Sequence, residues 1–231
     1  MSINAFMLRM IALTAMFCDH LGRTQLPELT WLTYIGRLAF PIFAFQVVEG
    51  FRHTRNIRNY AIRLLLLALL SEIPFDLMLY GEVFYRGHQN TVWTLSLALL
   101  TVHLLTGIQR FEPDPILRTI AAFLVAFAAC FTAAFLRFDH GGAGILQALV
   151  FYFIQDPRGR LAVTVFLNGL PSSGPYLPIP HPYLPVRVLG TFSLLPIRFY
   201  RGEPGHQSKG WTWFCYSFYP LHMLILALFS I

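Results

Sequence analysis

The side chains best suited to chemistry are an aspartate and a histidine, Asp19 and His20, at the end of an apolar stretch. Near neutral pH an imidazole can take a proton from an attacking amine or hydroxyl, so His20 is a candidate general base. The alternative is that His20 only forms a hydrogen bond at a helix end. Asp19 points about 100° away from its neighbour around a helix, so its expected partner is Arg37 rather than His20.

The apolar residues 35–51 carry Arg37 near one end and Glu49 near the other. A charged side chain inside a membrane span is costly, about 2.5–3.5 kcal/mol for Arg at the centre, and it usually faces the protein interior. Twelve residues separate the two, about 18 Å along a helix, so they cannot pair directly. Each is expected to find its partner on another helix.

Two carboxylates, Glu72 and Asp76, are four residues apart and therefore share one helical face, although Pro74 should distort that turn. An ion pair between Arg37 and Glu72 would be a purely structural explanation of both residues. The alternative is that these groups surround a catalytic cavity.

A second histidine, His222, follows Pro220 near the end of the chain. Proline has no N–H, so the carbonyl one turn earlier loses its partner, and His222 or a water could cap that defect. The functional alternative is a second titratable group that reaches the cavity of His20. Gln89 and Asn90, before the fourth span, could act as oxyanion donors or could simply cap that span.

The composition predicts an integral membrane protein. Of the 231 residues, 56% are hydrophobic and 12% are charged, against about 25% charged in soluble domains. No polar segment is long enough to fold separately, so residues 1–231 are expected to form one domain. In a membrane protein the net charge of +6 mainly reflects the basic loops that set the topology, so no nucleic-acid partner is expected. Neither a disulfide framework nor a metal ligand set is predicted.

The apolar stretches predict an all-α bundle of about nine transmembrane spans. Two are short or broken spans, or a re-entrant hairpin, within residues 161–195 around a Pro-rich outer loop at 171–185. The others are residues 5–21, 31–51, 60–80, 91–108, 116–136, 143–154 and 211–229.

The densest basic run, residues 52–58, predicts the orientation of the bundle. By the positive-inside rule this loop is cytoplasmic, and the N-terminus is then cytoplasmic too. Asp19, His20 and Arg37 are therefore expected toward the outer face, and Glu49 near the inner face.

On its motifs the chain resembles the TraX family, bacterial inner-membrane proteins named for the F-pilin acetylase. The matching pieces follow the family's order and cover most of the chain: residues 11–13 leading to Asp19-His20, then 35–41, 49–55, 71–76, Gln89-Asn90 and 218–222. The match is weakest over residues 161–195. Asp139 is also followed by His140, where the family tends to have Tyr.

The resemblance implies N-terminal acetylation of a small membrane protein. It also implies a distant relation to membrane acyltransferases that use acyl-CoA, whose first span often ends in a histidine, as at His20. Acetyl-CoA would then be the donor, and no metal would be needed. The implied partners are acyl-CoA, membrane lipids, and a small membrane peptide or another extracytoplasmic acceptor. The implied location is the bacterial inner membrane.

The predicted roles follow from that reaction. His20 would be the base, Asp19, Arg37 and Glu72 would hold the cavity, and His222 would assist. Substrate binding is assigned to Asp76, Gln89, Asn90 and Glu49. The cytoplasmic cluster would bind the phosphates of CoA, or would serve only topology and contacts with phospholipids; it consists of Arg52, His53, Arg55 and Arg58.

A small transporter or flippase is the competing hypothesis. The intramembrane charges and the broken segment around residues 171–185 favour it, since interrupted helices line transport paths. The hydropathy shows no inverted repeat, which argues against it. A weaker alternative is a scaffold for pilus or surface assembly. Dependence on acetyl-CoA separates the acyltransferase from both.

Overall fold

A computed structural model describes residues 2–169, 186–206 and 208–229. These residues form a bundle of helices with no β-strand, so the all-α prediction is confirmed. The helices are α1 (Ala5–Thr24), α2 (Thr30–Gly36), α3 (Ala39–His53), α4 (Ile57–Tyr80), α5 (Thr91–Phe111), α6 (Pro115–Phe135), α7 (Gly141–Phe153), α8 (Pro157–Gly169), the 3-10 helix η1 (Val186–Ser193), α9 (Leu194–Arg198) and α10 (Lys209–Phe229).

Long apolar helices establish the protein as an integral membrane protein. In the part of the chain that the structure describes, α1, α2 together with α3, α5, α6 and α10 are long and apolar enough to cross a bilayer. Helix α4 has 24 residues, and α7 is a shorter apolar helix. The Pro-rich loop predicted at 171–185 lies outside the described residues, so the count of about nine spans stays a prediction.

The predicted second span, residues 31–51, is interrupted. Helix α2 ends at Gly36 and α3 begins at Ala39. The N–H groups of Arg37 and Leu38 bond to carbonyls only three residues back, at 3.3 and 3.1 Å. Pro41 explains the break, because it has no N–H for the carbonyl of Arg37. The predicted span at 31–51 is therefore confirmed as part of a membrane-spanning segment, Thr30–His53, which consists of two helices rather than one.

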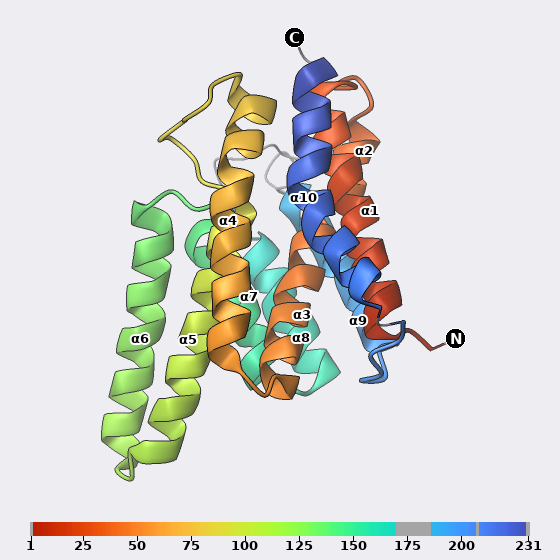
Figure 1. The fold of residues 1–231 in the computed structure, drawn as a ribbon. Coiled ribbons are helices and arrows are strands. Elements are labelled where there is room, and N and C mark those ends of the chain that lie inside the picture. The colour runs from red at the N-terminus through yellow and green to blue at the C-terminus, as the bar shows by residue number, and fades with distance from the viewer. Residues whose placement is uncertain (1, 170–185, 207, 230–231) are drawn as a thin grey trace.

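The first and last described helices lie side by side in the bundle. Figure 1 shows α1 and α10 running in the same direction, with α4 beside α10 and α3 and α7 behind. Helix α6 lies at the edge against α5 and α7 and exposes a ladder of stacked phenylalanines, Phe123, Phe127, Phe131 and Phe135. In a membrane protein such a face suits contact with lipid.

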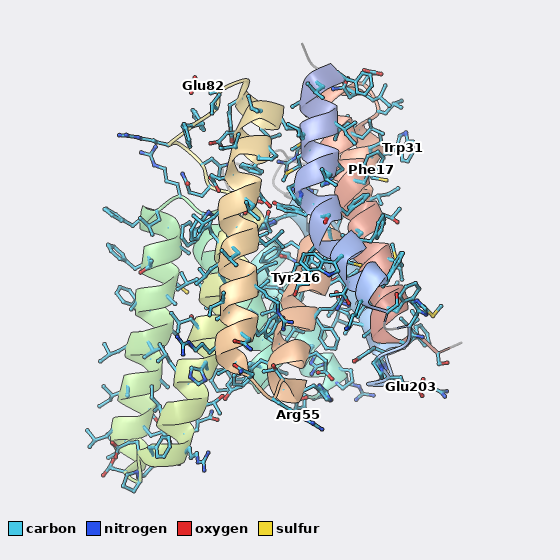
Figure 2. The ribbon with its side chains drawn as sticks, viewed as in Figure 1. Phe17, Trp31, Arg55, Glu82, Glu203 and Tyr216 are labelled. Atoms are coloured by element: carbon cyan, nitrogen blue, oxygen red, sulfur yellow. The ribbon has the colours of Figure 1, made fainter. Side chains whose placement is uncertain are left out.

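The two ends of the bundle hold different loops. Figure 2 shows Glu82 at one end and Arg55 and Glu203 at the other. The Arg55 end also holds the chain's N-terminal segment, because Ile3 forms backbone hydrogen bonds with Phe199 and Arg201 at 3.0 and 3.1 Å. This grouping agrees with the predicted placement of the basic loops and the N-terminus on one side. Which side is cytoplasmic remains a prediction.

Candidate active site

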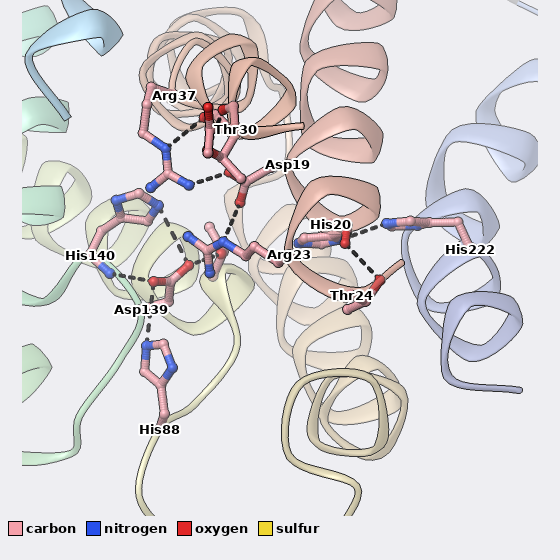
Figure 3. Close-up of polar contacts among 12 residues, drawn as sticks. Asp19, His20, Arg23, Thr24, Thr30, Arg37, His88, Asp139, His140 and His222 are labelled. Atoms are coloured by element: carbon pink, nitrogen blue, oxygen red, sulfur yellow. Dashed lines mark hydrogen bonds and ion pairs between the residues drawn. The ribbon is translucent and has the colours of Figure 1, made fainter. Parts of the chain in front are cut away.

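Asp19 binds two arginines at the far end of α1. It pairs with Arg37, as predicted, and its Oδ2 atom lies 2.9 Å from Nε of Arg23. Arg37 also donates from Nε to the carbonyl of Thr33 at 3.1 Å. The guanidinium of Arg37 thus binds Asp19, and the alternative ion pair with Glu72 is not formed (Figure 3).

His20 and His222 form a buried hydrogen bond between α1 and α10. Nδ1 of His20 lies 2.7 Å from Nε2 of His222, and the two ring planes differ by only 5°. Nδ1 of His222 lies 2.6 Å from the carbonyl of Phe218. The two histidines are 7% and 4% exposed. His222 therefore contacts His20 directly, but it is not among the residues that line the cavity, so its predicted place in that cavity stays a prediction.

The direction of these bonds fixes where the protons lie. A carbonyl only accepts, so Nδ1 of His222 must donate to Phe218, and Nε2 of a neutral His222 is then an acceptor. Nδ1 of His20 therefore donates to it, which leaves Nε2 of His20 with a free lone pair. Pro220 removes the partner of the carbonyl at residue 216, not at Phe218, so the capping explanation of His222 does not hold.

A cavity runs along the inside of the bundle past this histidine. It has an apolar middle, formed by Leu13, Met16, Phe43, Val47, Leu64 and Leu67. Its polar end is lined by Asp19, His20, Arg23, Arg37, Thr91, Asp139, His140 and Tyr219, and its other end by Arg9, Gln46, Tyr60 and Tyr216. Figure 2 shows Tyr216 inside the bundle, away from both ends.

Asp139 and His140, in the turn before α7, belong to the polar end although they were not predicted as site residues. Asp139 accepts from Oγ1 of Thr91 at 2.5 Å and from the N–H of His140 at 3.1 Å. Its carboxylate lies 3.4 Å from Nε2 of His88 and 3.5 Å from Nε2 of His140. The only sequence signal was an ionisable pair next to two glycines at the end of a span.

Glu72 and Asn90 are not among the residues that line the cavity; they join α4 to α5. Asn90 is fully buried, caps α5 through Val92 N–H at 2.9 Å, and donates to Glu72 and to the carbonyl of Ala68. Glu72 also accepts from the indole of Trp93 at 2.8 Å. The structure thus favours the capping interpretation of Asn90.

The other predicted substrate-binding residues also lie elsewhere. Asp76 accepts from the backbone N–H of Tyr85 at 2.8 Å, and Gln89 pairs through its backbone with Arg137 and Asp139 in the loop between α6 and α7. Neither Asp76 nor Gln89 lines the cavity of His20. Their assigned roles stay predictions without support from this geometry.

Glu49 and the basic cluster lie at the opposite end of α3. Glu49 pairs with Arg52 and His53 of its own helix, at 3.4 and 3.6 Å, so the expectation of a partner on another helix was wrong for it. Arg52 also donates to the carbonyls of Phe151 and Tyr152, both at 3.0 Å, and so caps α7. The other two members, Arg55 and Arg58, are exposed.

Within the described ranges, no three His, Cys, Asp or Glu side chains are grouped closely enough to hold a metal ion. The structure shows three acid or base groups in the site whose surroundings differ. These are one histidine with a free nitrogen, one carboxylate held by two arginines, and one carboxylate held by hydroxyl, amide and imidazole groups.

The fold and the site define an all-α integral membrane protein with a buried histidine pair between its first and last described helices. The family model of the TraX protein matches residues 5–230, so the chain belongs to the TraX family, as its motifs predicted. It is similar to the "Probable fimbrial assembly protein FimC, serogroup H1" of Dichelobacter nodosus, at 30% identity over 241 aligned residues, which cover 97% of this chain and 94% of that protein. No solved structure matches the chain.

Proposed function

We propose that this protein is a membrane acyltransferase that moves an acetyl group from acetyl-CoA to an amine or hydroxyl acceptor. The family and the relative named for fimbrial assembly support a pilin or a similar surface peptide as the acceptor, and the bacterial inner membrane as the location. The single observation that carries the proposal is the hydrogen-bond chain from Phe218 through His222 to His20, because it leaves a base in the cavity.

His20 acts as the general base in this reaction. Its Nε2 atom takes a proton from the attacking nitrogen or oxygen, which bonds to the carbonyl carbon of the thioester. The carbon–sulfur bond then breaks, and CoA leaves as a thiolate that receives the proton from His20. His222 stays neutral throughout, and its Nε2 atom accepts a hydrogen bond from Nδ1–H of His20, which stabilises the imidazolium.

The length of the cavity supports a donor that enters from the end opposite His20. Arg9 lines that end, and among the described residues it forms no ion pair with a carboxylate. An arginine without such a partner suits a phosphate of CoA. The apolar middle suits the uncharged arm that carries the thioester. Arg55 is exposed at the end of the bundle opposite Glu82, and Arg58, three residues further along the chain, is also exposed, so both are available to other phosphates.

The test is transfer of a labelled acetyl group by the purified protein in lipid vesicles. His20→Gln should lower the rate by a factor of about 10²–10⁴, the usual contribution of a general base. His222→Gln should lower it less, since it changes only the tautomer of His20. His103→Gln is the matched control, because His103 is exposed on α5 and outside the cavity.

Two results would contradict the proposal. One is unchanged acetyl transfer by a folded His20→Gln protein. The other is a melting temperature that does not respond to millimolar acetyl-CoA, with ATP as the control ligand. That second result would favour a transporter, for which the same cavity would be the passage.

A further inference from the structure

A second hollow lies apart from the cavity of His20, where two spanning helices end. Helix α5 begins at Thr91 and α6 ends at Phe135, and both are long and apolar enough to cross a bilayer. The hollow has a volume of about 680 Å³ and is lined by the side chains of Arg86 and Arg137 and by the rings of Trp93, Phe135 and Phe138. None of these residues lines the cavity of His20. Because it lies at the ends of spanning helices, this interfacial hollow is at the level of the lipid headgroups.

The two arginines of the interfacial hollow come from two loops that are fixed to each other. Arg86 belongs to the loop between α4 and α5, and Arg137 to the loop between α6 and α7. The N–H of Gln89 donates to the carbonyl of Arg137 at 3.0 Å, and the N–H of Asp139 donates to the carbonyl of Gln89 at 2.9 Å. Arg137 has a positive φ of 57°, which is uncommon for a residue other than glycine and is found most often at binding sites. The backbone thus holds both arginines at one hollow.

The positive charge of the interfacial hollow is not balanced by the protein. Two other arginines, Arg23 and Arg37, are bound to Asp19. In the part of the chain that the structure describes, the guanidinium groups of Arg86 and Arg137 form neither an ion pair nor a hydrogen bond. Both side chains are exposed, and no carboxylate lines the hollow. A guanidinium group binds a phosphate through two parallel hydrogen bonds, so the charge favours a phosphate ligand.

Aromatic rings continue from the interfacial hollow along the lipid-facing side of α6. Phe135 lines the hollow and is also the last ring of the ladder Phe123, Phe127, Phe131 and Phe135, whose ring centroids are 5.9–6.4 Å apart. Figure 1 shows α6 at the edge of the bundle. Trp93 and Phe138 stack at 5.9 Å, and Trp is enriched at membrane interfaces. A ligand of this surface is therefore both anionic and apolar.

We infer that the interfacial hollow binds an anionic phospholipid, such as phosphatidylglycerol. Its phosphate pairs with Arg86 and Arg137, and one acyl chain lies along the ladder of α6. A zwitterionic lipid carries the same phosphate, but its cationic group opposes a second arginine, so the pair of arginines selects a lipid with net negative charge. The bound headgroup joins the α4–α5 loop to the α6–α7 loop. This site is separate from the cavity of the proposed acetyl transfer and does not depend on that function.

The experiment measures how closely the lipid approaches the interfacial hollow. Bromine atoms on an acyl chain quench tryptophan fluorescence only at short range, and Trp93 lines the hollow. The chain has four tryptophans, so Trp31, Trp211 and Trp213 are replaced by Phe and Trp93 is the reporter. The full chain is placed in phosphatidylcholine vesicles that contain increasing fractions of brominated phosphatidylglycerol or of brominated phosphatidylcholine. Half-maximal quenching should need roughly fivefold less of the anionic lipid, given the usual attraction of arginines to anionic headgroups.

Variants assign this preference to the two arginines. Arg86→Gln combined with Arg137→Gln removes both charges, so the fivefold preference should vanish, and each single variant should retain part of it. Arg110→Gln combined with Arg158→Gln is the matched control, because both residues are exposed, neither lines the hollow, and the same charge is lost. If the chain with one tryptophan does not fold, the same variants are compared with all four tryptophans in place.

The outcomes concern this site alone, because acetyl-CoA is absent from the experiment. Equal quenching by the two lipids in the reporter chain, or an unchanged preference in the folded double variant of Arg86 and Arg137, overturns the inference. Displacement of brominated phosphatidylglycerol by millimolar glycerol phosphate would assign the hollow to a soluble phosphate ester and overturn the lipid as its occupant. Quenching that resists glycerol phosphate and requires the two arginines supports the lipid site.

Discussion

His222 forms two hydrogen bonds with fixed directions, and together they determine which nitrogen of His20 is free. Catalytic dyads often use a carboxylate for this purpose, and here a carbonyl and a second imidazole take its place. The arrangement holds the tautomer of His20 without adding a negative charge beside it. Asp19, the carboxylate next to His20 in sequence, is bound to arginines instead.

A pH dependence of stability follows from the low pKa of His140. Burial lowers this pKa in the folded protein below the value of about 6.5 expected in the unfolded chain. As the pH falls through 6.5, the unfolded chain binds the proton first, so the folded state loses stability. His140→Gln should therefore show a smaller drop in melting temperature between pH 7 and pH 5 than the wild type.

The control for this prediction is His103→Gln, which should keep the slope of the wild type. Equal slopes in His140→Gln and the wild type would show that His140 has the same proton affinity in both states. The measurement is thermal unfolding in detergent at matched ionic strength.

Individual contacts were predictable only where they follow from local geometry. Successive residues of a helix point about 100° apart, so Asp19 was predicted to pair with Arg37 and not with His20, and the structure confirms this ion pair. The contact of His20 with His222 joins residues 202 positions apart, and no local pattern reports it. Asp139 was missed because it lies in a turn, where periodicity carries no signal. An ion pair of Glu72 with Arg37 was considered because the sequence does not reveal that Asn90 and Trp93 donate hydrogen bonds to Glu72.

At the scale of elements, the turn between α2 and α3 brings Arg37 to α1. Gly36 permits this turn, because a Cβ atom there would occupy the space of the Asp19 side chain. The helices therefore approach each other closely at one point. The same point carries the ion pair that closes the polar end of the cavity.

Gly36→Ala should consequently destabilise the protein by about 1–3 kcal/mol, the usual cost of overpacking. Gly107→Ala is the matched control: Gly107 lies within α5, and a Cβ there meets nothing within 4 Å. This variant should be neutral or slightly more stable, because Ala favours a helix. Similar melting temperatures for the two variants would argue against a close contact at Gly36.

The elements themselves were largely predictable, and their interruptions were not. Hydropathy placed the spans of α1, α5, α6 and α10, because apolar length alone decides them. The break at Arg37 was missed, since a proline is also tolerated in the first turn of a helix and its effect depends on context. Pro74 illustrates this, because α4 continues through it.

At the scale of the whole molecule, the two ends of the bundle are expected on opposite sides of the membrane. Single cysteines in a chain without Cys18, Cys130 and Cys215 test this. Glu82→Cys should react with an impermeant maleimide on intact cells, and Arg55→Cys only after the cells are opened, because basic loops stay inside. The reverse pattern would invert the topology and would place the proposed donor entry on the side of the membrane away from the cytoplasm.

The pairing of the first helix with the last described one has a consequence for biosynthesis. His20 enters the membrane early in translation, and its partner follows 202 residues later. At the usual rate of about 5–20 residues per second, the ribosome needs roughly 10–40 s to supply His222. During that time His20 has no fixed tautomer, and the polar end of the cavity lacks Tyr219. The histidine pair therefore cannot form until the last described helix has been made and inserted, and the proposed acetyl transfer would begin only then.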